Sequence, residues 1–174
     1  MREIEIKAHV FDVDRIKLLI ESFAGKAGLV DKKDTYLKNE KGKLMRIRIN
    51  NGNLESTTKE TRKDENGDED NLEYEIQIRS SFEETLAFFN DLGFEFYFHK
   101  YKNGFEWNFE SVHIELLSVN DLGWFLEMER LMDFDIDNSS KENEIKHLHK
   151  LLSEFGLNDG DIETKSYRSM ILDR

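Results

Sequence analysis

The chain has 174 residues with 37 acidic and 25 basic side chains, giving a formal net charge of −12, and it contains neither cysteine nor proline. Without cysteine there is no disulfide framework, thiol nucleophile or cysteine-ligated metal, which fits the reducing conditions of the cytoplasm. The charged start, the lack of any apolar run of the roughly 20 residues that span a bilayer, and the acidity together predict a cytoplasmic single domain over residues 1–174 that binds neither membranes nor nucleic acid.

Eight segments alternate charged and apolar residues, the period of two that is typical of β-strands. They lie near Glu3–Lys7, Val30–Lys38, Met45–Ile49, Leu54–Thr61, Leu72–Ile78, His99–Lys102, Val112–Leu116 and Trp124–Glu129. The dipeptides Asn51-Gly52 and Asn103-Gly104 each separate strand-like runs, and they favour type I′ hairpin turns because Asn and Gly accept positive φ angles. Lys41-Gly42 is a weaker hairpin candidate.

Three segments have the apolar spacing of amphipathic helices. They run from a cap at Asp12 or Asp14 to Phe23, from Phe82 to Leu92, and from Ser139 to Phe155. A glycine follows the second and the third, as it often does at the ends of helices. The tail, Ser166–Asp173, is a candidate for a short fourth helix. The pattern therefore predicts one α+β domain with an antiparallel sheet.

The charged positions of the predicted strands sort by sign, although a merely solvated face usually mixes signs. Acidic residues occur as the pairs Glu3/Glu5, Glu73/Glu75 and Glu127/Glu129, with Glu115 alone. Basic residues occur as the pairs Arg46/Arg48 and Lys100/Lys102, with Lys7 and Lys59 beside them. Like charges two residues apart on one strand repel modestly, so such pairs call for an explanation.

Two arrangements explain charged faces of this kind. In the ordinary one, each charged face is wet and each apolar face covers the core. In the other, the sheet closes into a barrel, the helices cover its aliphatic outside, and the charged faces line a polar interior. Carboxylates in such an interior would bind Mg²⁺ or Mn²⁺, and its cations would bind phosphate oxygens, so the second arrangement suits a metal-bound polyphosphate.

The segment Glu3-Ile4-Glu5-Ile6-Lys7 resembles the ExExK signature of the CYTH superfamily, also called triphosphate tunnel metalloenzymes. Similar family elements follow in order along essentially the whole chain: Lys33-Asp34-Thr35-Tyr36-Leu37, Arg46-Ile47-Arg48, Lys59, Glu73-Tyr74-Glu75, Lys100-Tyr101-Lys102, Leu122–Glu129 and Lys165-Ser166-Tyr167. The resemblance implies a closed eight-stranded antiparallel β-barrel, a tunnel with a charged interior and helices packed outside, which binds a triphosphate and a divalent metal.

The resemblance also implies roles for individual residues. The ligands of Mg²⁺ or Mn²⁺ would be Glu3, Glu5, Glu115, Glu127 and Glu129. The triphosphate would be bound by Lys7, Arg46, Arg48, Lys59, Lys100 and Lys102. Tyr36 is a candidate catalytic residue that would contact the substrate or position a nucleophile, and a packing role suits it equally well.

Two positions depart from the family pattern. Lys102 stands where many members have arginine, which keeps the charge but loses the bidentate fork. Leu117 stands where members often have aspartate, so we expect Glu115, two residues earlier on the same strand face, to supply that carboxylate. This departure leaves the occupancy of a second metal open.

The remaining polar residues are given no ligand role. Glu73 and Glu75 are expected to orient the cations of the interior. His113, His147 and His149 form no recognisable ligand pattern, so we expect them at the surface.

Three functions are compatible with these residues. The first is a class IV adenylyl cyclase-like conversion of ATP to cyclic AMP and pyrophosphate, in which the 3′-hydroxyl attacks the α-phosphorus; the compact length and the Lys33–Leu37 and Lys165–Arg168 segments resemble that branch. The second is an inorganic or thiamine triphosphatase, in which water attacks the terminal phosphorus. The third is a non-catalytic polyphosphate or nucleotide binding module. The expected ligand is a nucleoside or inorganic triphosphate, and a homodimer is compatible with the family.

Overall fold

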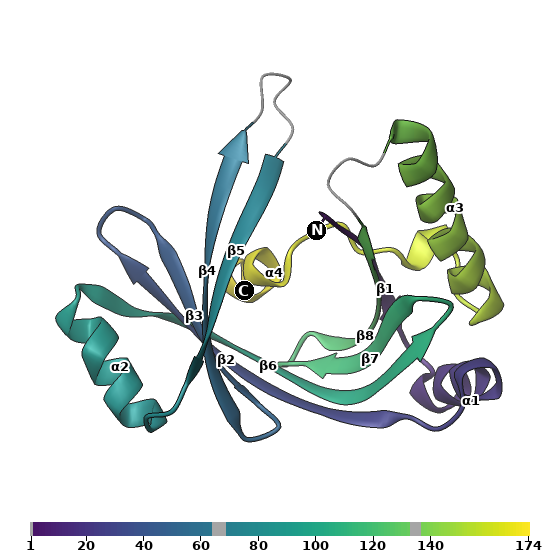
Figure 1. Ribbon diagram of the computed structural model, residues 1–174. Helices are drawn as coiled ribbons and strands as arrows, with labels where there is room; N and C mark the ends of the chain where they lie inside the picture. The colour runs from purple at the N-terminus through teal and green to yellow at the C-terminus, as the bar shows by residue number, and fades with distance from the viewer. Residues whose placement is uncertain (1, 64–68, 133–136) are drawn as a thin grey trace. The chain divides into compact units, whose positions relative to one another are not determined.

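A computed structural model describes the backbone of residues 2–63, 69–132 and 137–174, and the side chains in these ranges other than those of residues 2, 3, 59–63, 69–73 and 138. The strands are β1 (Arg2–Val10), β2 (Gly28–Asn39), β3 (Leu44–Asn50), β4 (Asn53–Lys63), β5 (Glu69–Ile78), β6 (Phe94–Phe109), β7 (Val112–Val119) and β8 (Gly123–Met132). The helices are α1 (Val13–Ala24), α2 (Phe82–Asp91), α3 (Asn138–Glu154) and α4 (Tyr167–Leu172), with a 3₁₀ turn at Asp159–Asp161 (Figure 1).

The predicted strands and helices are confirmed, most of the strands being longer than their alternating segments indicated. Asp12, one of the two predicted caps, is the residue before α1, and its side chain accepts a hydrogen bond from the backbone N–H of Arg15. Asn51 and Gly52 have φ angles of 47° and 86°, so the hairpin turn predicted between β3 and β4 is also confirmed. The prediction that the chain is α+β with an antiparallel sheet is therefore correct.

The hairpin predicted at Asn103-Gly104 is wrong, because both residues lie inside β6. Gly104 has a φ of 154°, and a Cβ built there would lie 2.1 Å from the backbone oxygen of Leu116 on the neighbouring strand β7. Glycine at this position therefore permits a close approach of two strand backbones rather than a turn.

The eight strands form one sheet in the order β1-β8-β7-β6-β2-β3-β4-β5. The order begins at β1 and ends at β5, and in the described ranges these two strands are not hydrogen-bonded to each other. The sheet is thus not closed by hydrogen bonds, so closure into a barrel stays a prediction.

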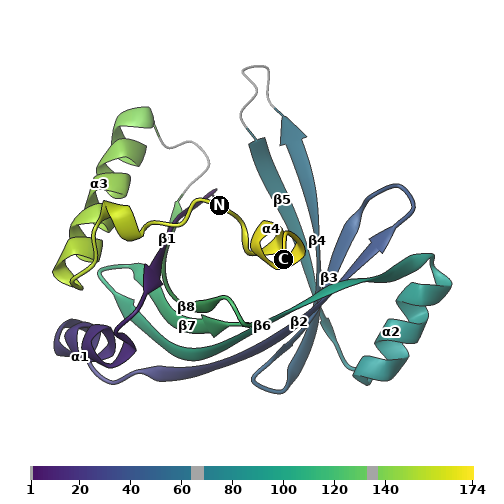
Figure 2. The same cartoon turned by 180° about the vertical axis from the view of Figure 1, so that it is seen from behind.

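The chain divides into two compact units. The first unit comprises residues 1–30 and 102–174, and the second comprises residues 31–101. In the first unit, the even-numbered residues Ile4, Ile6, Ala8 and Val10 of β1 are buried in an apolar cluster with residues of α1 and α3. Figures 1 and 2 show both helices on one side of β1, β8 and β7, which agrees with the predicted helix-covered aliphatic face.

Helix α4 is an exception to the prediction that the helices pack on the aliphatic face. Its residue Tyr167 belongs to a second apolar cluster with Val30, Leu117, Val119 and Phe125. In both views α4 lies on the side of β7 and β8 opposite to α1 and α3 (Figure 2). The helix therefore covers one end of the face that carries the charged residues.

The open edge of β1 is partly occupied by the segment that precedes α4. Ala8 forms an isolated antiparallel bridge with Ile162, and the backbone N–H of Glu163 donates to the carbonyl of Lys7 at 2.8 Å. His9 adds a side-chain contact, its Nε2 lying 3.1 Å from Glu163 Oε2. The C-terminal segment is thus fixed next to the second half of β1.

In the second unit, helix α2 covers the aliphatic face of β2 and β3. Leu37, Ile47 and Phe89 form its buried cluster, and Met45 and Phe94 pack against it. A capping box at Ser81 and Glu84 fixes the start of the helix. None of the described helices is long and apolar enough to cross a membrane.

We predict that Ile16→Ala in α1 lowers the free energy of unfolding by about 2–5 kcal/mol, because Ile16 is fully buried in the cluster of the first unit and its truncation leaves a cavity. Leu18→Ala on the same helix is the control, since Leu18 is 68% exposed and should cost less than about 0.5 kcal/mol. Denaturant titration measures both. Equal losses for the two variants would contradict the assignment of the buried face.

Candidate metal and phosphate site

The charged face of the first unit is the side of β1, β6, β7 and β8 opposite to α1 and α3. The register pairs Lys7 with Glu127, Glu5 with Glu129, Glu115 with Glu127, and Glu106 with Glu115, so these side chains share one face. Its described side chains include five carboxylates and two ammonium groups: Glu5, Glu106, Glu115, Glu127 and Glu129, with Lys7 and Lys102. The excess of carboxylates in a partly buried face favours the binding of cations.

Lys102 and Glu127 form a buried ion pair in this face. Lys102 Nζ donates to Glu127 Oε2 at 2.7 Å, and each side chain is 10% exposed. Burial lowers the pKa of Lys102, but the charge and hydrogen bond of Glu127 outweigh burial and leave the pKa above its usual value. Lys102 therefore stays charged at neutral pH.

The second carboxylate oxygen of Glu127, Oε1, does not take part in the pair with Lys102. In the described part of the chain, Glu127 Oε1 is buried and has no hydrogen-bond partner. A buried carboxylate oxygen without a partner is costly unless a ligand satisfies it. Glu127 can thus hold a divalent cation through Oε1 while Oε2 remains on Lys102, and the residues present fit a hard cation with oxygen ligands.

Lys7 lies under the C-terminal helix. Its Nζ is 4.3 Å from the centre of the Tyr167 ring and donates to the carbonyl oxygen of Lys165. Burial lowers the pKa of Lys7, and the nearby carboxylates of Glu5, Glu127 and Glu163 offset that effect only in part. The Tyr167 ring also lies 5.0 Å from Lys102 Nζ, so one aromatic side chain contacts both lysines.

In the second unit, the sequence-predicted phosphate residues surround a buried carboxylate. Asp34 is fully buried and accepts hydrogen bonds from Arg48 Nε at 2.6 Å and Arg48 Nη2 at 2.8 Å. Burial raises the pKa of Asp34, but the hydrogen bonds from Arg48 and the charges of Lys100 and Arg48 outweigh it, so the pKa is below its usual value. The bidentate fork of Arg48 is therefore used by a residue of the chain itself.

Asp34 also fixes Lys100, and through it Tyr36. Lys100 Nζ lies 3.3 Å from Asp34 Oδ2 and 3.1 Å from the hydroxyl of Tyr36. The ring of Tyr36 stacks on Phe98 with 4.4 Å between ring centres. Tyr36, the predicted catalytic candidate, thus lies beside a predicted phosphate ligand and also has the packing role that the sequence left open.

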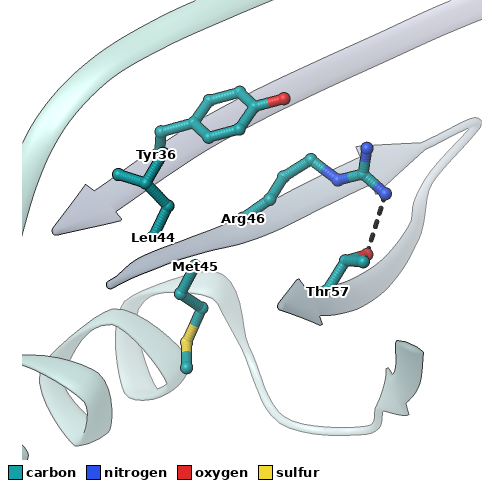
Figure 3. Close-up of a pocket in the computed structure, with 5 residues that line it drawn as sticks. All are labelled: Tyr36, Leu44, Met45, Arg46 and Thr57. Atoms are coloured by element: carbon teal, nitrogen blue, oxygen red, sulfur yellow. Dashed lines mark hydrogen bonds between the residues drawn. The ribbon is translucent and has the colours of Figure 1, made fainter. Parts of the chain in front are cut away.

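Arg46 is less tightly held than Arg48. Its Nη2 donates to Thr57 Oγ1 at 2.8 Å and lies 3.8 Å from Glu75 Oε2, whereas Nε is buried and lacks a partner in the described ranges. The contact with Glu75 agrees with the predicted role of that residue in orienting a cation. Tyr36, Leu44, Met45, Arg46 and Thr57 line a pocket with a volume of about 80 Å³ (Figure 3).

The structure separates the predicted site residues into two sets. Glu5, Glu115, Glu127, Glu129, Lys7 and Lys102 belong to the first unit, whereas Arg46, Arg48, Lys100 and Tyr36 belong to the second. The side chains of Glu3, Lys59 and Glu73 lie outside the described residues. Their places on β1, β4 and β5 follow from the backbone alone.

Sequence reasoning gave no role to Asp34 or Glu55, although both are buried on the charged face of the second unit. Glu55 Oε1 lies 3.9 Å from Arg48 Nη1, so the arginine has a carboxylate on either side. The signal for Asp34 was its position two residues before Tyr36 in a family-like segment, but its partner Arg48 is identified only by the pairing of β2 with β3.

The expectation that His113 belongs to no ligand cluster is wrong. His113 is partly buried, and its Nε2 lies 3.7 Å from Glu106 Oε2 and 3.5 Å from Glu115 Oε1. One ligand atom from each of these three residues lies within 4.8 Å of the others. His147 and His149 instead lie on α3 and face Glu110 and Asp159, outside the charged face.

We predict that Asp34→Asn lowers the free energy of unfolding by about 3 kcal/mol at pH 7, because it removes the carboxylate that pairs with buried Arg48 through two hydrogen bonds. Since the native pKa of Asp34 is lowered, its stabilising effect is complete above the unfolded pKa of about 3.9 and is lost as the pH falls through the lower native pKa. The acid side of the stability curve should therefore be shallower in the variant.

Urea titrations between pH 2 and pH 7 test this, with Asp31→Asn as the control because Asp31 is exposed and its pair with Lys33 spans 3.8 Å. A variant curve parallel to that of the parent protein below pH 4 would refute the role of Asp34.

Comparison with solved structures supports the fold. A Pyrococcus horikoshii OT3 protein, PH1012, is 28% identical, with a TM-score of 0.73 over 95% of this chain and 97% of its own. A Vibrio parahaemolyticus structure described as a putative adenylate cyclase is 17% identical, with a TM-score of 0.76 over 98% and 97%. A Hippeastrum structure, described as a putative adenylyl cyclase with a dominant triphosphatase activity, is 16% identical, with a TM-score of 0.64 over 99% and 96%.

At these identities the last two likenesses concern the fold alone. No match to this sequence was found among curated proteins. The family model of the CYTH domain, however, matches residues 1–167, which is nearly the whole chain. Together with the ExExK segment on β1 and the charged faces described above, this match shows that the chain belongs to the CYTH family.

Proposed function

We propose that the protein is a divalent-metal-dependent enzyme that acts on a nucleoside triphosphate, and that its reaction is the adenylyl cyclase type, which converts ATP to cyclic AMP and pyrophosphate. CYTH family members are typically metal-dependent cyclases or triphosphatases. The roles of the individual residues, and the closure of the sheet into a tunnel, are parts of this proposal.

The metal part of the proposal is supported by the first unit. Five carboxylates face two lysines there, and Glu127 Oε1 is buried without a partner among the described residues. We assign Glu5, Glu115, Glu127 and Glu129 to Mg²⁺ or Mn²⁺, together with Glu3, because carboxylate oxygens are the ligands that both ions accept. When bound, the metal would neutralise charge on the phosphates and activate the attacking oxygen.

The phosphate part is supported by the second unit. Arg46, Arg48 and Lys100 have side chains that are 14%, 13% and 12% exposed, so their charges are poorly screened by solvent. Asp34 holds Arg48 and Lys100 in fixed positions, which reduces the entropy lost when an anion binds. We assign these three residues, with Lys7, Lys59 and Lys102, to the triphosphate.

The pocket at Arg46 is the observation that favours a nucleoside triphosphate over an inorganic one as the substrate. Two of its lining residues, Tyr36 and Leu44, offer largely apolar surface on the same strand face as Arg46, whose Nε is buried and has no partner among the described residues (Figure 3). An inorganic triphosphate has no apolar part that would gain from such a wall, whereas a nucleoside does. Tyr36 would then contact the nucleoside while Arg46 binds phosphate.

Hydrolysis of a small triphosphate is the second candidate. Its support is the size of the same pocket, since about 80 Å³ is well below the several hundred Å³ typical of pockets that enclose organic ligands. In that case a water molecule would attack the terminal phosphorus, while the metal and the same cations would stabilise the charge of the phosphates.

The two candidates give different products. The full chain is incubated with ATP and, separately, with tripolyphosphate, in the presence of Mn²⁺ or Mg²⁺, and the products are separated by chromatography. Cyclic AMP with pyrophosphate supports the cyclase, and orthophosphate supports hydrolysis. Tight binding of either ligand with neither product would contradict both and leave the non-catalytic binding module.

We predict that Glu5→Gln reduces metal-dependent turnover at least about 100-fold while the free energy of unfolding stays within about 0.5 kcal/mol of the parent value, because Glu5 is exposed and is assigned to the metal. Glu40→Gln, in the exposed turn between β2 and β3, is the matched control. Unchanged turnover in Glu5→Gln would remove this residue from the metal site.

We also predict that Leu44→Gln lowers kcat/KM for ATP about tenfold, because it replaces apolar pocket surface of similar size by a polar amide. Activity toward tripolyphosphate, which lacks a nucleoside, should be unaffected and serves as the internal control. If both substrates lose activity equally, the pocket does not contact the nucleoside.

A further inference from the structure

The three residues Glu106, His113 and Glu115 bring ligand atoms together on the charged face of the first unit. Glu106 lies on β6 and the other two lie on β7, where Glu106 is paired with Glu115 in the strand register. His113 precedes Glu115 by two residues, so both side chains leave β7 on the same face. The ligand atoms of all three lie within 4.8 Å of one another.

The orientation of the His113 ring suits a metal ligand. Its Nδ1 lies 3.3 Å from the side-chain oxygen of Asn108, the residue directly opposite on β6. A proton on Nδ1 donated to this oxygen leaves the lone pair on Nε2, which is the atom that faces Glu106 and Glu115. Metal-bound histidines are usually held in this way by a hydrogen bond from the other ring nitrogen.

The charges around the cluster point to a cation. With the lone pair on Nε2, three electron-rich atoms face one another, and a bound cation would convert their repulsion into attraction. Glu127, opposite Glu115 on β8, adds a buried carboxylate whose Oε1 has no partner among the described residues, and its side chain is 10% exposed. Lys102 is paired with the other oxygen of Glu127, Oε2.

The neighbouring positions on β7 limit where this cation can lie. Leu117, the next residue on the same face, is fully buried against Phe125 and Tyr167 and offers no ligand. Glu115 is therefore the last carboxylate of β7 toward that end, and on its other side the next residue of this face is His113. A cation bound by Glu115 in addition to the one at Glu127 would lie toward His113.

We propose that Glu106, His113 and Glu115 form a second divalent-cation site with one imidazole and two carboxylate ligands. The proposal rests on the proposed function, because it adds a cation to the same metal-dependent face. An imidazole ligand favours Mn²⁺, Co²⁺ or Zn²⁺ over Mg²⁺, so this site would select a transition metal, whereas an all-carboxylate set accepts Mg²⁺ as well.

The test is a titration of the full chain with CoCl₂, followed by visible absorption and by calorimetry, in buffer without phosphate. We expect the parent protein to bind one more Co²⁺ ion than His113→Gln. The control His149→Gln, which removes a histidine–carboxylate pair on α3, should retain the parent stoichiometry. Asn108→Ala should weaken the extra site about 10- to 100-fold without abolishing it, because it removes only the partner of the ring.

A second measurement is made on the parent protein, in which the cluster is intact. In a spectrum of the histidine rings of the parent protein, addition of ZnCl₂ should shift the resonances of His113, assigned from their absence in His113→Gln, and leave those of His149 in place. Equal Co²⁺ stoichiometry in the parent and in His113→Gln, or unshifted His113 resonances under Zn²⁺, would overturn the proposal and leave His113 as a counter-ion of Glu106 and Glu115.

These outcomes are separable from the test of the proposed function. Cobalt binding that depends on His113, without turnover of ATP or tripolyphosphate, would refute the enzyme and retain the cation site. Turnover with Mn²⁺ that is unchanged in His113→Gln, together with unchanged stoichiometry, would retain the enzyme and refute the site.

Discussion

Successive side chains of a strand leave it on opposite faces, and this constraint determines which charges of the protein can meet. On β1 the even residues are committed to the apolar cluster under α1 and α3, so Glu5 and Lys7 must point the other way. The same division operates in the second unit, where α2 covers Leu37 and Ile47 and the opposite face holds Asp34 and the arginines. The helices thus select the charged face indirectly, by covering the other one.

Burying charged side chains on such a face costs desolvation free energy, and the observed ion pairs offset part of that cost. Replacing a buried ion pair by apolar residues is often neutral or stabilising, so Arg48–Asp34 and Lys102–Glu127 are poorly explained as devices for stability. They are better explained as fixed charges that keep their positions in the absence of a ligand. Tyr167, which contacts Lys7 and Lys102 together, extends this arrangement to the C-terminal helix.

The fold was largely predictable because its signal is local: alternating residues indicate strands, and capping residues such as Asp12 indicate helix starts. The site was less predictable, because its contacts depend on the register in which the strands pair. Arg48 meets Asp34, and Glu106 meets Glu115, only through the pairing of strands that the sequence does not specify, so the Asp34 pair and the His113 cluster were missed. The Asn103-Gly104 dipeptide was wrongly predicted to form a turn. It lies within β6, where Gly104 lets the backbone of β7 approach closely.

The bridge between Ala8 and Ile162 has a consequence for the behaviour of the protein in concentrated solution. An edge strand with unpaired backbone groups is a template for pairing with another chain, and β1 is the first strand of the sheet order. The Ile162–Glu163 segment covers part of the second half of that edge through the bridge and through the hydrogen bond to the Lys7 carbonyl. Loss of the C-terminal segment would therefore expose unpaired backbone groups of β1 as well as the charged face, and would promote self-association.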